Sequence, residues 1–186
     1  MRSIFFILCL FFSFNLFAQK ITNLKIEGIS IGDSALDFFS KSHIKKNSYY
    51  YKSKKFTRVQ NDLFSWFENF DAVDFHFKTG DQLYKIYSVS GIKFYDKNIE
   101  ECYPFLEEIT FTVNKALNTL PINSGTSKFS GDISGKSTFT QVSWAVGDGY
   151  VVAICYDYSK KYGGQDHFEL AIDTPELFDF LANDAY

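Results

Sequence analysis

The sequence predicts a single α+β domain, in which an antiparallel sheet combines with one long and two short helices in a helix-then-strands order that is repeated twice. Three observations predict this class. Several short segments alternate apolar and polar residues, and one long segment places apolar residues at intervals of three and four. In addition, no long linker rich in Pro, Gly and Ser divides the chain.

The long helix is predicted between Ile99 and Leu120, where apolar residues form one continuous stripe. The stripe also contains Cys102, Leu106, Ile109, Val113 and Leu117. Pro104 conflicts with a helix interior, because proline removes a backbone hydrogen bond and clashes with the preceding turn. The helix therefore either kinks at Pro104 or begins near Tyr103.

The two short helices are predicted at residues 32–44 and 174–184. Asp33 or Ser34 is the expected N-cap of the first, because short polar side chains satisfy the exposed N–H groups of a helix start. Thr174 is the expected N-cap of the second, and the proline that follows it suits the first helical position.

The alternating segments predict strands at residues 23–29, 56–60, 72–78, 83–95 and 167–173. In the third of these, three apolar residues face away from Asp74 and His76. Residues 137–159 are predicted to form a hairpin that turns at Asp148–Gly149, since an Asp-Gly pair is a strong turn signal. The segment 121–137 is rich in Ser and Gly and is expected to be a long loop.

The first residues of the chain have the pattern of a secretory signal peptide. Arg2 precedes an apolar run at positions 4–17, and the small residue Ala18 closes it. The run is shorter than the roughly 20 residues that a membrane-crossing helix needs. We therefore expect residues 1–18 to be removed, leaving the domain 19–186 in the periplasm or secreted, without a transmembrane segment.

Cys102 and Cys155 are the cysteines that remain after the leader, with Cys9, is removed. An even pair in an oxidising compartment favours a disulfide. Closing a loop of this length contributes about 4 kcal/mol in the chain-entropy model. Two buried free thiols are the alternative interpretation, and a catalytic cysteine is disfavoured because no His base lies near either one in the sequence.

Motifs for common enzyme classes are missing from the sequence. The segment GDISGKST at 131–138 resembles a phosphate-binding loop, but it has three residues between its glycines where that motif needs four. The sequence also lacks the G-x-S-x-G elbow of many hydrolases and the zincin helix motif. We therefore predict no catalytic residues and no cofactor. The formal net charge of −3 gives no bulk attraction to nucleic acid.

The three histidines, His43, His76 and His167, are far apart and lack the spacing of metal ligands, so we predict no metal site. His76 with Asp74, and His167 with Asp166, are candidates for polar pairs. The plainer interpretation is that these histidines lie at the surface or on the face of a strand.

The segment 41–58 is strongly basic and contains no acidic residue. Its candidate contacts with an anionic surface are Lys45, Lys46, Tyr49, Tyr50, Tyr51, Lys52, Lys54, Lys55 and Arg58. Residues 162–186 are acidic and contain no Lys or Arg. The alternative is that both segments are solvated faces, or that they attract each other within the fold.

The motifs IEGISIGDSALDFFSK at 26–41, IEECYPFLEEI at 99–109 and SGKS at 134–137 resemble those of a family of small exported proteins from AT-rich marine bacteria. The resemblance implies a shared fold and compartment and brings no catalytic residues. The chain departs from the family's pattern at Pro104, where a charged helix usually runs through. A weaker similarity, at the level of the fold, links the SIGDSALDFF opening to small outer-membrane assembly lipoproteins.

These observations predict an exported protein that acts as a non-catalytic interaction or envelope accessory module. Its expected partner is an envelope protein or an anionic surface. The alternative is an envelope hydrolase or a small-ligand-binding protein. That alternative requires a cleft that gathers polar groups such as Asp74, His76 and Asp157.

Overall fold

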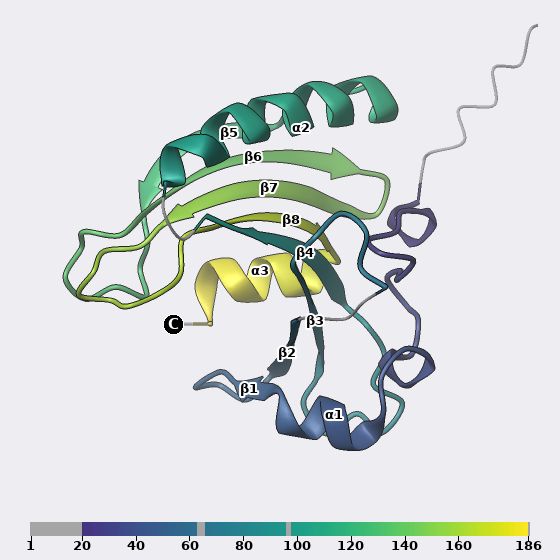
Figure 1. Cartoon of the computed structure of the whole chain (residues 1–186). Coiled ribbons are helices and arrows are strands. Elements are labelled where there is room, and N and C mark those ends of the chain that lie inside the picture. Colours follow the sequence, from purple (N-terminus) through teal and green to yellow (C-terminus); the bar gives the residue numbers. More distant parts are fainter. Residues whose placement is uncertain (1–19, 63–65, 96–97, 186) are drawn as a thin grey trace, which may run out of the picture.

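The computed structural model of the protein describes residues 20–62, 66–95 and 98–185. These residues form one open sheet of eight antiparallel strands in the order β1-β2-β3-β4-β8-β7-β6-β5 (Figure 1). The predicted α+β class is confirmed, whereas the twofold repeat of a helix-then-strands order stays a prediction. The expected signal peptide, residues 1–18, lies outside the described residues. No helix of the described residues is both long and apolar enough to span a membrane.

The strands are β1 (Ser48–Tyr50), β2 (Phe56–Asp62), β3 (Ala72–Lys78), β4 (Ser88–Phe94), β5 (Asn123–Lys128), β6 (Thr138–Val146), β7 (Gly149–Asp157) and β8 (His167–Asp173). The α-helices are α1 (Lys41–Lys46), α2 (Cys102–Leu117) and α3 (Pro175–Asn183). Short 3-10 helices lie at η1 (Ile21–Asn23), η2 (Ala35–Asp37) and η3 (Ile99–Glu101).

Strand predictions succeeded for most strands with one apolar face and missed the edge strands, which lack that pattern. The predicted bounds of β3 and β8 are those observed, and β6 and β7 form the expected hairpin, with its turn one position earlier, at Gly147–Asp148. The expected loop 121–137 contains the edge strand β5, all of whose side chains are exposed, so no apolar alternation marked it. The sequence analysis also missed β1, the opposite edge strand.

One predicted strand was wrong and another was too long, and a local backbone turn lies in each. At 23–29 the backbone turns through Glu27 and Gly28, both with positive φ, so the neighbouring isoleucines form one isolated bridge. The predicted strand 83–95 is limited to β4, because Tyr84 adopts a positive φ that ends an extended run.

Helix ends follow the capping residues. The helix expected at 32–44 is divided in two: Ser34 caps η2 and Ser40 caps α1, each through its side-chain oxygen. Thr174 caps α3 as predicted, with proline at its first position. Pro104 lies in the first turn of α2, where no intrahelical N–H bond is lost, and this resolves the conflict in favour of a helix start near Tyr103.

One face of the sheet, here called the apolar face, is built from alternate residues of each strand. A single register row crosses six strands on this face and is buried throughout: Val59, Phe75, Val89, Ile172, Val151 and Trp144. The N-terminal segment packs on it through residues such as Phe39, whose ring lies 5.5 Å from that of Phe75. Helix α2 packs over β7 and β8.

The opposite face of the sheet, here called the polar face, is partly covered by α3. Figure 1 shows α2 and α3 on opposite sides of the curved sheet. Leu177 and Phe180 of α3 are buried in a separate apolar cluster with Tyr51 and Phe56. Because α3 covers part of this face, the neighbouring part is only partly open to solvent.

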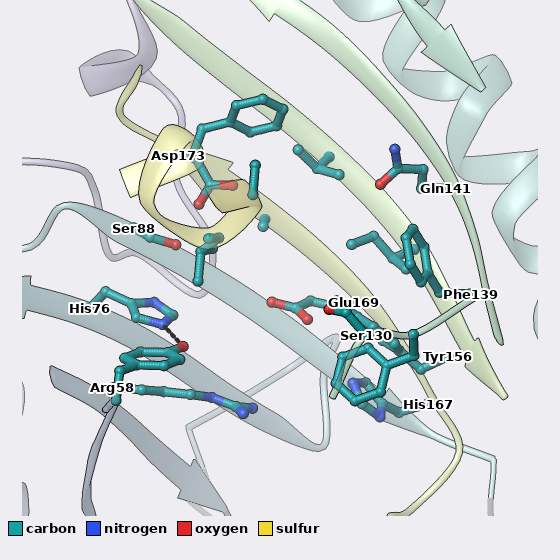
Figure 2. A pocket seen from close by; sticks show the side chains of 18 of the residues that line it. Arg58, His76, Ser88, Ser130, Phe139, Gln141, Tyr156, His167, Glu169 and Asp173 are labelled. Carbon is teal, nitrogen blue, oxygen red and sulfur yellow. Dashed lines mark hydrogen bonds between the residues drawn. The ribbon is translucent and has the colours of Figure 1, made fainter. Parts of the chain in front are cut away.

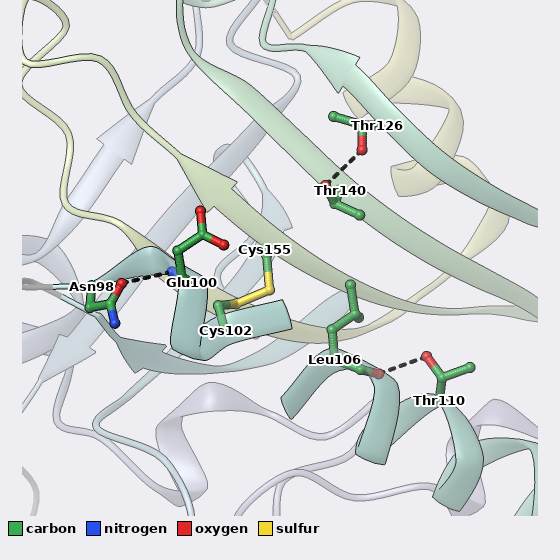
Figure 3. Close-up of a disulfide and its surroundings, with 8 residues drawn as sticks. All are labelled: Asn98, Glu100, Cys102, Leu106, Thr110, Thr126, Thr140 and Cys155. Atoms are coloured by element: carbon green, nitrogen blue, oxygen red, sulfur yellow. Dashed lines mark hydrogen bonds between the residues drawn. A yellow bond between two sulfur atoms is a disulfide. The ribbon is translucent and has the colours of Figure 1, made fainter. Parts of the chain in front are cut away.

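The structure places Cys102 and Cys155 at disulfide-bonding distance, with their Cα atoms 6.1 Å apart (Figure 3). Both are buried, and they join the first turn of α2 to the apolar face of β7. The other end of α2 is held by a 2.7 Å hydrogen bond, which the Trp144 indole donates to Asn114. The helix is therefore fixed to the sheet near both of its ends.

The double variant Cys102→Ser/Cys155→Ser is expected to lower the free energy of unfolding by about 4 kcal/mol, because the unfolded chain regains the loop entropy that the disulfide removes. Urea unfolding of the variant and of the oxidised wild type measures this difference. The fully reduced wild type serves as a control, since it should lose a similar amount. Unfolding midpoints that coincide for all three proteins would contradict a stabilising disulfide.

Candidate functional site

A pocket of about 370 Å³ lies on the polar face of the sheet (Figure 2). Its floor is formed by β2, β3, β4, β8, β7 and β6, and its walls are formed by α3 and by the segments that follow β5 and β7. The lining combines charged, aromatic and aliphatic side chains, as small-molecule sites commonly do. The volume lies within the range of such sites.

A row of polar residues crosses the pocket floor because the strand register aligns them. Arg58 in β2 is paired with His76 in β3, which is paired with Ser88 in β4 and, through it, with Asp173 in β8. Directly opposed residues in antiparallel strands project to the same face. This row therefore runs side by side with the buried apolar row on the other face.

Arg58 and Asp74 form an ion pair beneath the pocket. Both Nε and Nη2 of Arg58 contact the Asp74 Oδ2 atom. The side chain of Asp74 is 1% exposed and that of Arg58 is 31% exposed, so the guanidinium also reaches the pocket. Burial raises the pKa of Asp74 above its usual value, although Arg58 opposes this change. Burial, the largest single effect, lowers the pKa of Arg58. The charges of Asp74 and Glu169, together with Tyr51 and the hydrogen bond to Asp74, outweigh burial and raise the pKa.

His76 is held neutral in the pocket. It is 5% exposed, and its Nε2 atom lies 2.8 Å from the hydroxyl of Tyr51. Burial lowers its pKa to about 3, and the positive charge of Arg58 acts in the same direction. The other ring nitrogen, Nδ1, has no hydrogen-bond partner in the described part of the chain. His76 thus brings a buried polar atom without a partner to the pocket.

Asp173 brings a second such atom. It is 3% exposed, its carboxylate accepts a hydrogen bond from Ser88, and its Oδ1 atom is without a partner among the described residues. Burial raises its pKa to about 7, against the effect of the Ser88 hydrogen bond. Near neutral pH this carboxyl group exists in both protonation states.

Glu169 and His167 complete the polar lining from β8. Figure 2 shows the Glu169 carboxylate extending towards the side of the pocket where His76 and Arg58 lie. The Nδ1 atom of His167 lies 2.8 Å from the carbonyl oxygen of Gln165, and burial lowers the ring's pKa. A neutral imidazole that donates from Nδ1 has a lone pair on Nε2, so His167 adds an acceptor.

An aromatic wall closes the pocket on the side of the loops. The Phe129 ring makes edge contacts with Tyr156, Tyr158 and Tyr162 at centroid distances of 5.9, 5.3 and 5.4 Å. Gly131 permits this arrangement, because a Cβ atom at that position would lie 2.6 Å from the Phe129 ring. The rings therefore depend on a close approach between the loop backbone and Phe129.

The carboxylate of Asp132 joins the two loops that carry the aromatic wall. Its Oδ2 atom accepts hydrogen bonds from the hydroxyls of Ser134, Ser137 and Ser159 at 2.8, 2.7 and 2.8 Å. These hydrogen bonds lower the pKa of Asp132, and the one from Ser137 has the largest effect. The segment that resembled a phosphate loop thus folds around its own aspartate, between strands β5 and β6.

The predicted basic segment is divided between the surface and the pocket. Tyr51 and Arg58 line the pocket, whereas Tyr49 and Tyr50 are exposed. The lysines at 45, 46, 52, 54 and 55 are also exposed. The Lys55 Nζ atom lies 3.8 Å from the Glu176 Oε1 atom. The basic segment 41–58 and the acidic segment 162–186 are therefore in contact through one ion pair. Binding of an anionic surface by these residues stays a prediction.

The histidine pairs expected from neighbouring positions have other partners. Asp74 pairs with Arg58, and Asp166 accepts a 2.7 Å hydrogen bond from the backbone N–H of Tyr158. The two strand histidines lie on a strand face as expected, but they are buried. The cleft required by the small-ligand alternative is present and is lined by His76. Asp157 was wrongly included, because it projects to the apolar face of β7.

The sequence analysis missed Glu169, Asp173 and Gln141 as pocket residues. A signal was present in β8, where His167, Glu169 and Asp173 share one face of an alternating strand. Such a face is usually exposed to solvent. Here α3 and the loops after β5 and β7 partly cover this face. No pattern in the local sequence predicts that cover.

Comparison with known proteins found no family model that matches the chain, and no similar curated protein or solved structure. In the described ranges 20–62, 66–95 and 98–185, no three His, Cys, Asp or Glu side chains gather as a metal site requires. The resemblances noted in the sequence stay predictions. The function must therefore be argued from the pocket itself.

Asp173→Asn is expected to change how stability depends on pH. Burial raises the pKa of Asp173 in the folded protein to about 7, from 3.8. Its contribution to the free energy of unfolding is therefore most favourable below pH 3.8, where the carboxyl group is protonated in both the folded and the unfolded chain. This contribution is lost as the pH rises through 7, because the buried group must then become charged. Asparagine carries no charge, so the variant should gain on the order of 2 kcal/mol relative to wild type between pH 5 and pH 8. Urea unfolding at both pH values measures this gain.

The exposed substitution Asp179→Asn on α3 corrects for the change in net charge. A difference between the Asp173→Asn variant and wild type that is the same at pH 5 and pH 8 would contradict the raised pKa. In the wild type and in the variant alike, His76 has the opposite effect on how stability depends on pH. Because its pKa is lowered in the folded protein, the free energy of unfolding decreases as the pH falls below 6.5. Its contribution cancels when the two proteins are compared at one pH.

Asp132→Asn is expected to loosen the two loops of the aromatic wall. A neutral amide oxygen is a weaker acceptor than a carboxylate, and three serine hydroxyls cannot all be satisfied by it. Hydrogen exchange at the amides of Ser137 and Ser159 should become about tenfold faster, as local opening becomes easier. The exposed change Asp184→Asn is the control. Unaltered exchange at both amides would show that Asp132 does not hold these loops.

Proposed function

We propose that the protein is an exported, non-catalytic binding protein whose polar-face pocket holds a small polar molecule. The observation that carries this proposal is the pair of buried atoms His76 Nδ1 and Asp173 Oδ1. Both belong to residues that line the pocket, and both are without a hydrogen-bond partner in the described part of the chain. The proposal adopts the small-ligand alternative of the sequence analysis and gives the predicted interaction role a definite site.

The energetic argument concerns the cost of these two atoms. About 90% or more of buried polar groups in folded proteins have a partner, and leaving one unsatisfied costs about 1–3 kcal/mol. A ligand that donates or accepts hydrogen bonds at His76 and Asp173 would offset this cost. Aliphatic lining residues such as Val152 and Ala171 would at the same time bury the ligand's apolar surface.

The pKa of His76 argues against general-base catalysis by this residue. An efficient general base has a pKa near the working pH, whereas burial lowers that of His76 to about 3. One observation favours the second candidate, an envelope hydrolase: Asp173 has a pKa of about 7 and shares the pocket with Glu169. A carboxyl group with a raised pKa is the general acid of many hydrolytic sites.

The proposed compartment is the periplasm or the extracellular medium. It is supported by the signal-like sequence of residues 1–18 and by the Cys102–Cys155 pair, since disulfides persist in oxidising compartments. The exposed lysines of the 41–58 segment provide an additional contact surface for an anionic envelope component.

A screen of polar small molecules tests the proposal, with Ala171→Phe as the blocking variant. Ala171 lies on the pocket floor, so a phenyl group there should fill part of the cavity that a ligand would occupy. The probes are amino acids, nucleosides, organic acids, polyamines and sugars. At least one probe class should raise the melting temperature of the wild type by a few degrees, as binding to the native state does. The same class should leave Ala171→Phe unshifted.

Ala116→Phe is the matched control, because it makes the same change at an exposed position of α2. It should respond to the probes as the wild type does. Absence of any shift in the wild type, or equal shifts in wild type and Ala171→Phe, would contradict a binding function of this pocket. Chemical conversion of a bound probe would instead support the hydrolase.

A further inference from the structure

A second hollow of about 260 Å³ adjoins the pocket and is here called the vestibule. It shares Tyr51, Arg58, Phe129 and Tyr158 with the pocket, so the two spaces meet along these side chains. The remaining vestibule residues are Tyr49, Gln60 and Tyr162. Both hollows combine aromatic and polar side chains, and five of the seven vestibule residues carry aromatic rings.

The polar groups of the pocket include both acceptors and donors. Acceptors are provided by the Glu169 carboxylate and by the Asp173 Oδ1 atom. Donors are provided by the guanidinium of Arg58 and the amide of Gln141. A hydroxyl group of a ligand would satisfy neighbouring donors and acceptors at once, because it donates one hydrogen bond and accepts others.

Charged ligands fit this set of groups less well. A cationic amine has donors but no acceptors, and it would meet the positive charge of Arg58. An anion would meet the negative charge of Glu169, which lines the pocket. Arg58 is already paired with Asp74, so its guanidinium is less available to an anion. Lys128, which also lines the pocket, is exposed at the end of β5, where water screens its charge.

The exposed ring of Tyr162 favours a ligand with a flat apolar face. The Tyr158 ring is stacked on that of Tyr156 at 5.5 Å between centroids and lies 5.0 Å from that of Tyr162, so neighbouring rings already cover it. Tyr162 is 42% exposed, so its ring is within reach of a ligand in the vestibule. A sugar ring has C–H faces that pack on aromatic rings and a rim of hydroxyls that form hydrogen bonds.

We infer that the ligand is a neutral carbohydrate of at least two rings. One ring is held by Glu169, Asp173 and His76 in the pocket, and the next ring packs against the exposed ring of Tyr162 in the vestibule. Two rings are proposed because the two hollows, of about 370 and 260 Å³, share four lining residues, so one ring can occupy each. This inference rests on the proposed binding function and specifies the class of ligand.

Calorimetric titration with defined sugars tests the inference. The probes are glucose, galactose, mannose and N-acetylglucosamine, each as the free monosaccharide and as its disaccharide. Spermidine and glutamate represent the cationic and anionic alternatives. At least one disaccharide should bind roughly fivefold or more tightly than its monosaccharide, as expected for an added aromatic contact. It should also bind more tightly than spermidine and glutamate.

Two variants test which part of the disaccharide each hollow binds. Glu169→Gln should weaken binding of the disaccharide by about tenfold, because a charge-assisted hydrogen bond is lost in the pocket. Tyr162→Ala should lower the ratio of disaccharide to monosaccharide affinity by roughly fivefold, because the second ring loses its contact. Tyr50→Ala is the matched control: Tyr50 is 56% exposed and lines neither hollow, so the ratio should not change.

The failures of the two proposals give different results. If spermidine, glutamate or another probe that is not a sugar binds wild type but not Ala171→Phe, while no sugar binds, the carbohydrate inference is wrong and the binding function stands. If monosaccharides and disaccharides bind equally, the vestibule is not a second ring site. If no probe binds wild type, both proposals are overturned.

Discussion

Side chains at successive positions of a β-strand point to opposite faces of the sheet, and the rest of this structure depends on that constraint. Strands β3 and β8 each place apolar residues on one face and ionisable residues on the other. A single backbone therefore carries the buried row through Phe75 and the polar row through His76. The core and the candidate site share the same strands, so a shift of register by one residue would exchange them.

Enclosure of the polar face comes from segments that are distant in sequence. Helix α3 covers one part, through Leu177 and Phe180, and the loops joined by Asp132 carry the aromatic wall on another. Glu176 on α3 forms a 2.9 Å salt bridge with Lys78 on β3, but exposed pairs of this kind contribute little to stability. The apolar contacts of α3 therefore account for most of its binding to the sheet. The helix partly covers the polar groups that lie next to these contacts.

Stability and site chemistry are divided between the two faces. The apolar face holds the disulfide, the long helix and the main core. The polar face holds groups whose burial is unfavourable in isolation, such as Asp173 and His76. Retaining such groups is consistent with a role for them in recognition, since a packed apolar cluster at the same positions would be more stable. The cost on one face is offset by the packing on the other.

The sequence by itself determined the α+β class, the bounds of β3, β8 and α3, and the pairing candidates Cys102 and Cys155, because each depends on local periodicity, capping or a small number of cysteines. It did not reveal edge strands β1 and β5, whose side chains lack an apolar face. Only the tertiary structure decided that the polar sides of β2, β3 and β8 meet in a pocket. The physical reason is that alternation fixes which residues share a face, whereas long-range packing decides whether that face is open to water or enclosed.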